Sequence, residues 1–151
     1  MDSRYGLASA MAMVVSWAAP TYGHLSQPAQ LAVEIVGLKG PQGQVCLNLF
    51  DSTNGFPSNR DEAVATLCIA IADDGPLVAT FEELPPGSYA VSVFHDANGD
   101  GEFNRNFVGM PVEGFGFSSN PNAVTGPPDY SEAVFLVVGD ETRIEIELNY
   151  F

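Results

Sequence analysis

The chain has 151 residues, 46% apolar and 16% charged, which suffices for one domain with a hydrophobic core and excludes disorder by composition. Its 19 Asp and Glu residues outnumber its 5 Lys and Arg residues, so the formal net charge is −14. This charge excludes nucleic acid as a partner, because no basic surface can be assembled to neutralise phosphates, and it disfavours anionic lipid while attracting cations.

The first 23 residues have the pattern of an export signal. Residues 7–19 form a small and apolar run, and small residues precede an expected cleavage before His24. A membrane anchor is the alternative, but a run of 13 residues is too short to cross a bilayer. We therefore expect a signal peptide over 1–23, one domain over 24–151, no membrane span in the mature chain and a periplasmic or extracellular location.

Short alternating runs of apolar residues, and no helical period, repeat along the rest of the chain. Turns rich in Gly, Pro and Asp separate these runs, and one helical turn is expected at residues 59–63. The sequence therefore predicts an all-β fold, a seven-stranded antiparallel β-sandwich. The expected strands lie at residues 31–35, 45–49, 67–71, 77–81, 89–93, 135–138 and 144–150.

Both cysteines, Cys46 and Cys68, fall in predicted strands of the mature domain. Cys46 shares a strand face with Asn48, and Cys68 with Thr66, opposite to the apolar residues of each strand. Two small buried hydrophobic residues would instead lie among the apolar residues. If the strands are neighbours, a disulfide would close a loop of about 22 residues and stabilise the fold by about 3 kcal/mol. The pattern favours a Cys46–Cys68 disulfide in an oxidising compartment.

Acidic and amide side chains concentrate in residues 95–107. Alternate residues of this stretch occupy positions 1, 3 and 5 of a calcium-loop pattern, and Gly101 at position 6 permits a sharp turn. Hard cations such as Ca²⁺ bind where several oxygens converge. The expected ligands are the side chains of Asp96, Asn98 and Asp100, the carbonyl of Glu102, and Asn104 or a water that it holds.

This calcium pattern is incomplete, because position 12 is Phe107 in place of the bidentate glutamate of an EF-hand, and no flanking helices are predicted. The remaining oxygens would have to come from Glu113, Asp129 or Asp51. With two carboxylates in the loop, the expected dissociation constant is about 10⁻⁴–10⁻³ M. A metal-free turn is the alternative, because Asp, Asn and Gly are favoured in any tight loop.

A long connection over residues 109–131 contains aromatic residues, which argue for order. Phe115 and Phe117 either pack this connection over one end of the sandwich or offer a stacking platform for a glycan or an extracellular protein, with Asn122 among the hydrogen-bond donors. On the second interpretation the ligand residues are Glu113, Phe115, Phe117, Asn120 and Tyr130.

No catalytic constellation is recognisable in the sequence. His24 and His95 are the only histidines of the expected mature chain, and His95 continues the apolar register of its strand, which is typical of a buried, hydrogen-bonded histidine. We therefore expect a non-catalytic binding or structural module. The alternatives are a metal-free structural module of the envelope and a hydrolase that uses the carboxylates of Glu102 and Glu113, whose spacing does not single them out.

Several of these segments resemble a known family. Residues 81–91, 95–101 and 109–118, together with 43–45 and 56–57, resemble a family of exported bacterial proteins known only as a domain of unknown function, number 2141. The resemblance covers about residues 30–150 and implies an exported β-sandwich of prealbumin-like or immunoglobulin-like topology. Residues 84–89 alone are similar to many transthyretin-like and carboxypeptidase-regulatory-like sandwiches. The resemblance implies no activity or ligand, so the calcium interpretation rests on the loop residues.

Overall fold

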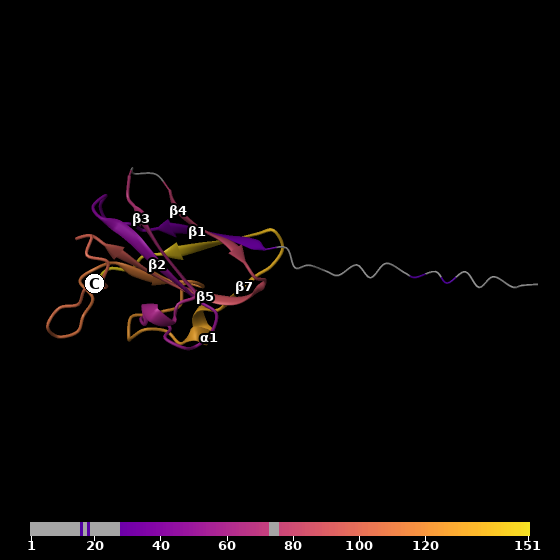
Figure 1. The fold of residues 1–151 in the computed structure, drawn as a ribbon. Helices are drawn as coiled ribbons and strands as arrows, with labels where there is room; N and C mark the ends of the chain where they lie inside the picture. The colour runs from indigo at the N-terminus through magenta and orange to yellow at the C-terminus, as the bar shows by residue number, and fades with distance from the viewer. Residues whose placement is uncertain (1–15, 17, 19–27, 73–75) are drawn as a thin grey trace, which may run out of the picture.

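The computed structural model describes residues 16, 18, 28–72 and 76–151, so the expected signal peptide and its cleavage point lie almost entirely outside the described residues. Eight strands of the described part form two sheets (Figure 1). One sheet has three strands in the order β4-β1-β8, and the other has the order β3-β2-β5-β6, with β7 also paired to β5. The strands are β1 (Ala29–Val36), β2 (Gln44–Phe50), β3 (Ala65–Ala70), β4 (Leu77–Leu84), β5 (Gly87–Asp96), β6 (Phe115–Phe117), β7 (Phe135–Val137) and β8 (Glu141–Glu147).

Helical structure in the described residues is limited to the 3₁₀ turn η1 (Arg60–Glu62) and the short helix α1 (Tyr130–Ala133). The all-β class is confirmed, and each of the seven expected strands has a counterpart, although the last one ends at Glu147 and not at Tyr150. The turn η1 lies where one helical turn was expected, whereas α1 was not predicted. No helix within residues 28–72 and 76–151 has the length and apolar character needed to cross a membrane.

Two details of the predicted fold were wrong. The structure has an eighth strand, β6, inside the segment that was interpreted as a loop, and β1 pairs with β8 in parallel. A three-residue strand is too short to produce a readable alternation, and alternation carries no information about strand direction. The sequence pattern could therefore reveal neither feature.

The core lies between the two sheets. Leu31, Val33 and Ile35 of β1 are buried together with Val45 and Leu47 of β2 in one hydrophobic cluster. The alternation of the strands places these side chains inward, and full burial of each contributes about 1.5–3 kcal/mol. The inward face of the larger sheet is thus used for packing, which leaves its outer face for other roles.

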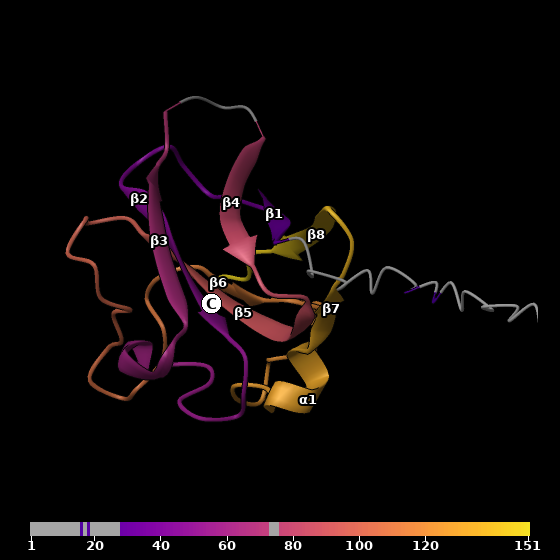
Figure 2. The ribbon, with the colours of Figure 1, turned by 45° about the vertical axis from the view of Figure 1, so that its right-hand side comes forward.

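Along the strands of the five-stranded sheet, the residues that alternate with the core residues point to the outer face. Cys46 of β2 lies directly opposite Cys68 of β3 in the antiparallel register, and the two form the expected disulfide. Two long connections, residues 97–114 and 118–129, lie over this face of the sheet (Figure 2), and Asn120 of the second connection also contacts β8 of the three-stranded sheet.

A second, smaller hydrophobic cluster holds these connections against the outer face. Phe115 and Phe117 of β6 are 7% and 8% exposed, and Phe103, Ala123 and Tyr130 pack around them. The Phe56 ring meets the rings of Phe50, Phe117 and Tyr130 edge-on, with centroids 5.5, 6.1 and 5.8 Å apart. The aromatic residues of the long connection therefore pack over the sheet.

Candidate functional site

Asp96, at the end of β5, organises the turn that follows the strand. Its carboxylate is fully buried: Oδ1 accepts a hydrogen bond from the Asp100 N–H at 3.1 Å, and Oδ2 accepts one from the Gly101 N–H at 2.8 Å. Gln44 of β2 donates to Oδ2 from Nε2 at 2.7 Å. Gly43 has a positive φ of 79°, and a side chain there would collide with the Asp96 carbonyl oxygen, so this close approach requires glycine.

The other residues of the predicted calcium loop lie around Asp100. Asn98 donates from Nδ2 to Asp100 Oδ2 at 2.8 Å and to Asn104 Oδ1 at 3.2 Å, and Asn104 Nδ2 donates to the same Asp100 oxygen at 3.1 Å. The Glu102 N–H donates to Asp100 Oδ1 at 2.9 Å. The hydrogen bond from Glu102, followed by those from Asn98 and Asn104, lowers the pKa of Asp100 because each stabilises the charged form.

Glu113 is the distant residue that joins this loop. Its Oε2 accepts a hydrogen bond from the Asn104 N–H at 2.9 Å, and its side chain is buried. Burial raises the pKa of Glu113, and the charges of Asp96 and Asp100 raise it further.

The other two candidate ligands lie elsewhere. Asp129 caps helix α1 in a capping box with Glu132. Asp51 follows the last residue of β2, whereas Gln44, which contacts Asp96, is the first residue of that strand.

The loop offers a mixed set of oxygens. No group of three or more His, Cys, Asp or Glu side chains in the described part of the chain is placed to hold a metal ion. A cation at this loop would therefore need the amide oxygens of Asn98 and Asn104 and the Glu102 carbonyl as well as carboxylates. The Asn98 amide nitrogen now points at the oxygens of Asp100 and Asn104, so its side chain would have to rotate to present Oδ1.

A groove opens beside this loop on the outer face of the larger sheet. Its volume of about 710 Å³ lies within the range of about 300–1,000 Å³ that is typical of ligand pockets. Residues 97–114 and 118–129 contribute to its walls, and the chain terminus contributes Phe151. Side chains that line it include Asn48, Ser92, Phe94, Phe115 and Phe117 of the sheet, with Arg60, Phe103, Arg105, Met110, Val124 and Phe151 around them.

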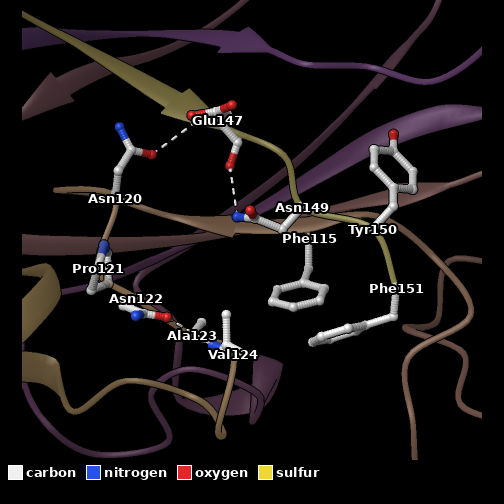
Figure 3. A pocket seen from close by; sticks show the side chains of 10 residues that line it. All are labelled: Phe115, Asn120, Pro121, Asn122, Ala123, Val124, Glu147, Asn149, Tyr150 and Phe151. Carbon is white, nitrogen blue, oxygen red and sulfur yellow. Dashed lines mark hydrogen bonds between the residues drawn. The ribbon is translucent and has the colours of Figure 1, made fainter.

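A smaller pocket of about 280 Å³ lies between β8 and residues 120–124 (Figure 3). Asn120 fastens this connection to β8, since its Nδ2 donates to the Glu145 carbonyl at 3.2 Å and its Oδ1 accepts from the Glu147 N–H at 2.9 Å. The rings of Phe115 and Phe151 face each other at this pocket with their centroids 5.5 Å apart. Asn120 is therefore already engaged with the backbone.

The five residues expected to form a ligand loop separate into different places. Glu113 joins the Asp96 loop, Phe115 and Phe117 line the groove, and Asn120 binds β8. Tyr130, in α1, packs against Phe56 and donates to the Ser88 carbonyl at 3.2 Å.

Sequence reasoning missed part of the groove. Arg60, Phe94, Phe103, Arg105 and Phe151 all line it, yet they come from separate parts of the chain. The signal that could have drawn attention to the arginines is their rarity in a chain with only 5 Lys and Arg residues.

His95 is a buried histidine with both ring nitrogens satisfied, as its register predicted. Nε2 donates to the Gln42 carbonyl at 2.7 Å, so Nδ1 accepts from the Tyr150 hydroxyl at 2.9 Å. Both nitrogens are used within the fold, which leaves neither as a proton acceptor for a substrate.

A family model described as "Uncharacterized protein conserved in bacteria (DUF2141)" matches residues 33–145. The match extends from within β1 into β8 and includes the Asp96 loop, Glu113 and both connections over the groove. Searches of curated proteins and of solved structures returned no match to the chain.

Proposed function

Since the chain belongs to the uncharacterised bacterial family DUF2141, whose description names no activity, we propose a function from the site itself. The protein is an exported, non-catalytic binding module in which the Asp96 loop binds Ca²⁺ and the groove beside it holds a ligand. The observation that carries this proposal is the convergence of Glu113 on the loop of Asp96 and Asp100, where the wall of the groove begins.

The donor chemistry supports calcium. After side-chain rearrangement, Asp96, Asp100 and Glu113 would supply carboxylates, and Asn98 and Asn104 would supply amide oxygens, a set of hard oxygen ligands that suits Ca²⁺. Their number favours a weak site, with a dissociation constant of about 10⁻⁴–10⁻³ M. Bound calcium would tie residues 96–104 to Glu113 and so hold the connection that contributes Phe103, Arg105 and Met110 to the groove.

The disulfide and the sheet topology support an exported prealbumin-like module. A Cys46–Cys68 disulfide is typical of an oxidising compartment, which fits the signal peptide expected over residues 1–23. In an immunoglobulin constant-type domain the first two strands are neighbours in one sheet. Here β1 and β2 belong to different sheets, which favours the prealbumin-like alternative.

Binding is favoured over catalysis because the residues that a reaction would use are committed elsewhere. His95 is satisfied by Gln42 and Tyr150. Glu113 is buried against the Asp96 loop, whereas the Glu102 side chain is exposed, so the two carboxylates of the hydrolase alternative do not share one environment. A metal-free structural module is the second candidate, because the hydrogen bonds around Asp100 would also hold the turn without a cation.

Calcium titration followed by melting temperature tests the metal proposal. At ten times its dissociation constant, calcium should add about 1.4 kcal/mol to the stability of the wild-type protein and raise Tm by about 5 °C. Asp100→Asn should abolish the rise, whereas Asp61→Asn, an exposed substitution in η1, should leave it unchanged. No shift of the wild-type Tm at millimolar calcium would reject the calcium site and favour the metal-free module.

N-terminal sequencing of the protein recovered from its natural host tests export. A mature chain that begins at His24 is expected. Retention inside the cell with an uncut leader would contradict this part of the proposal.

A further inference from the structure

We propose that the groove binds a small amphipathic anion, a molecule with an apolar body and a single negatively charged head group. The inference rests on the proposed function in one respect, namely that the groove is the ligand site. It does not depend on calcium binding.

The apolar body is inferred from the lining of the groove. Phe94, Phe115 and Phe117 of the sheet line it, and these side chains are no more than 8% exposed. Around them, Met110, Val124 and Phe151 are 43%, 72% and 63% exposed. Large apolar side chains from three separate segments thus meet water around one concave site, and an apolar ligand that covers them would gain their burial.

The charge of the head group is inferred from two arginines. Arg60 of η1 and Arg105 of the 97–114 connection both line the groove, although the chain has only 5 Lys and Arg residues and a net charge of −14. Among the described residues the one salt bridge joins Arg143 to Glu141, so neither groove arginine is paired with a carboxylate. In so acidic a protein, two arginines without carboxylate partners at the same concave site are the feature that needs a function.

Each of these arginines is oriented by a neutral partner. Arg60 donates to Thr66 Oγ1 at 3.3 Å, and Arg105 donates to the Gly109 carbonyl at 3.0 Å while lying over the Phe103 ring. A guanidinium has five N–H donors, so each side chain keeps donors for a carboxylate, sulfate or phosphate group.

The head group should carry one charge. Glu102 also lines the groove, so the charged side chains there are two arginines and one glutamate, and the arginines outnumber the carboxylate. This balance suits a monoanion better than a polyanion. A membrane surface of anionic lipid is disfavoured because the whole chain carries a charge of −14.

Isothermal titration with decyl sulfate, below its micellar concentration and in about 0.15 M salt, tests this inference. Decan-1-ol has the same chain without the charge, and decyltrimethylammonium reverses the charge. We expect one saturable site for decyl sulfate, binding of decanol weaker by at least about tenfold, and no saturable binding of the cation.

Three arginine variants separate groove recognition from overall charge. Arg60→Gln and Arg105→Gln should each weaken decyl sulfate binding by about tenfold. Arg143→Gln removes the same charge outside the groove and should change the affinity by less than about twofold, because exposed charges are screened in salt. Equal losses in all three variants, equal binding of decanol, or no saturable binding of decyl sulfate would each overturn the inference. Co-sedimentation with vesicles of phosphatidylcholine and phosphatidylglycerol would instead assign the groove to a lipid surface.

The titrations are repeated in 2 mM calcium and in EGTA. Binding of decyl sulfate in either condition, without any calcium-dependent rise in Tm, would support the groove inference and reject the calcium site. A calcium-dependent rise in Tm, without binding of decyl sulfate in either condition, would support the calcium site and reject the groove inference.

Discussion

Two carboxyl groups of the Asp96 loop have pKa values shifted in opposite directions. The pKa of Asp100 is lowered by donated hydrogen bonds, so its contribution to stability is present above the unfolded-state pKa and is lost as the pH falls. The pKa of Glu113 is raised by burial and by neighbouring negative charges, so its contribution is present at low pH and is lost as the pH rises through the folded-state pKa. At neutral pH without a cation, ionised Glu113 therefore opposes folding.

Glu113→Gln tests this assignment at the residue scale. In calcium-free buffer at about pH 7 the variant should have a higher Tm than the wild type, because a neutral amide keeps the acceptor oxygen for Asn104 without the charge. Below about pH 4 the difference should disappear, because Glu113 is then protonated in the wild type. Melting curves across this pH range are the measurement, with Glu102→Gln as the exposed control. A variant that melts below the wild type at neutral pH would contradict the assignment.

Gly114 is a second position where one atom matters. A Cβ at this residue would collide with the Tyr150 ring, whose hydroxyl donates to His95. Gly114→Ala should therefore lower the free energy of unfolding by about 1–3 kcal/mol, measured by urea denaturation. Gly87→Ala is the matched control, because a Cβ there would meet the Tyr89 ring at an ordinary contact of 3.7 Å. Equal stability of the two variants would show that Tyr150 moves aside without cost.

At the scale of elements, alternation of apolar residues located the strands because one face of each strand is buried. Val45, Leu47 and Leu49 point into the core, and the cysteine between the first two points to the outer face. This orientation of Cys46, away from the core residues of its strand, was sufficient to predict the disulfide. The parallel pairing of β1 with β8 and the short strand β6 depend on tertiary contacts that leave no periodic signal.

The disulfide gives the prediction that belongs to this scale. The double variant Cys46→Ala/Cys68→Ala should lose about 3 kcal/mol of stability, because the unfolded chain regains the entropy of a loop of 22 residues. Urea denaturation of the wild type in reductant should show a similar loss, and the double variant should not respond to reductant. A double variant as stable as the oxidised wild type would mean that the β2–β3 pairing does not need the bond.

At the scale of the whole molecule, residues that are close in the sequence were easier to group into a candidate site than residues from separate segments. The Asp96 loop is contiguous, so its residues could be named from their spacing, and the structure adds Glu113 from a set of three candidates. The groove could not be predicted, because Asn48, Arg60, Phe94 and Phe151 meet only when two connections fold over the outer face. Its two arginines are single residues in unrelated segments, and no motif joins them.

The net charge of −14 leads to a last prediction for the whole chain. One salt bridge is present among the described residues, so most of the 19 acidic groups repel one another without a nearby cation. Raising sodium chloride from about 0.01 M to about 0.5 M should therefore raise Tm at neutral pH, because the Debye length falls and the repulsion is screened. Near pH 4.1, the isoelectric point of the sequence, the same addition should have little effect. A salt response of equal size at both pH values would mean that general salt effects, and not self-repulsion, set it.

Because screening alone stabilises the chain, the calcium titrations must be made at constant ionic strength, with magnesium as the divalent control. A calcium-dependent rise in Tm can be assigned to the loop under two conditions. Magnesium must not produce an equal rise, and Asp100→Asn must remove the rise.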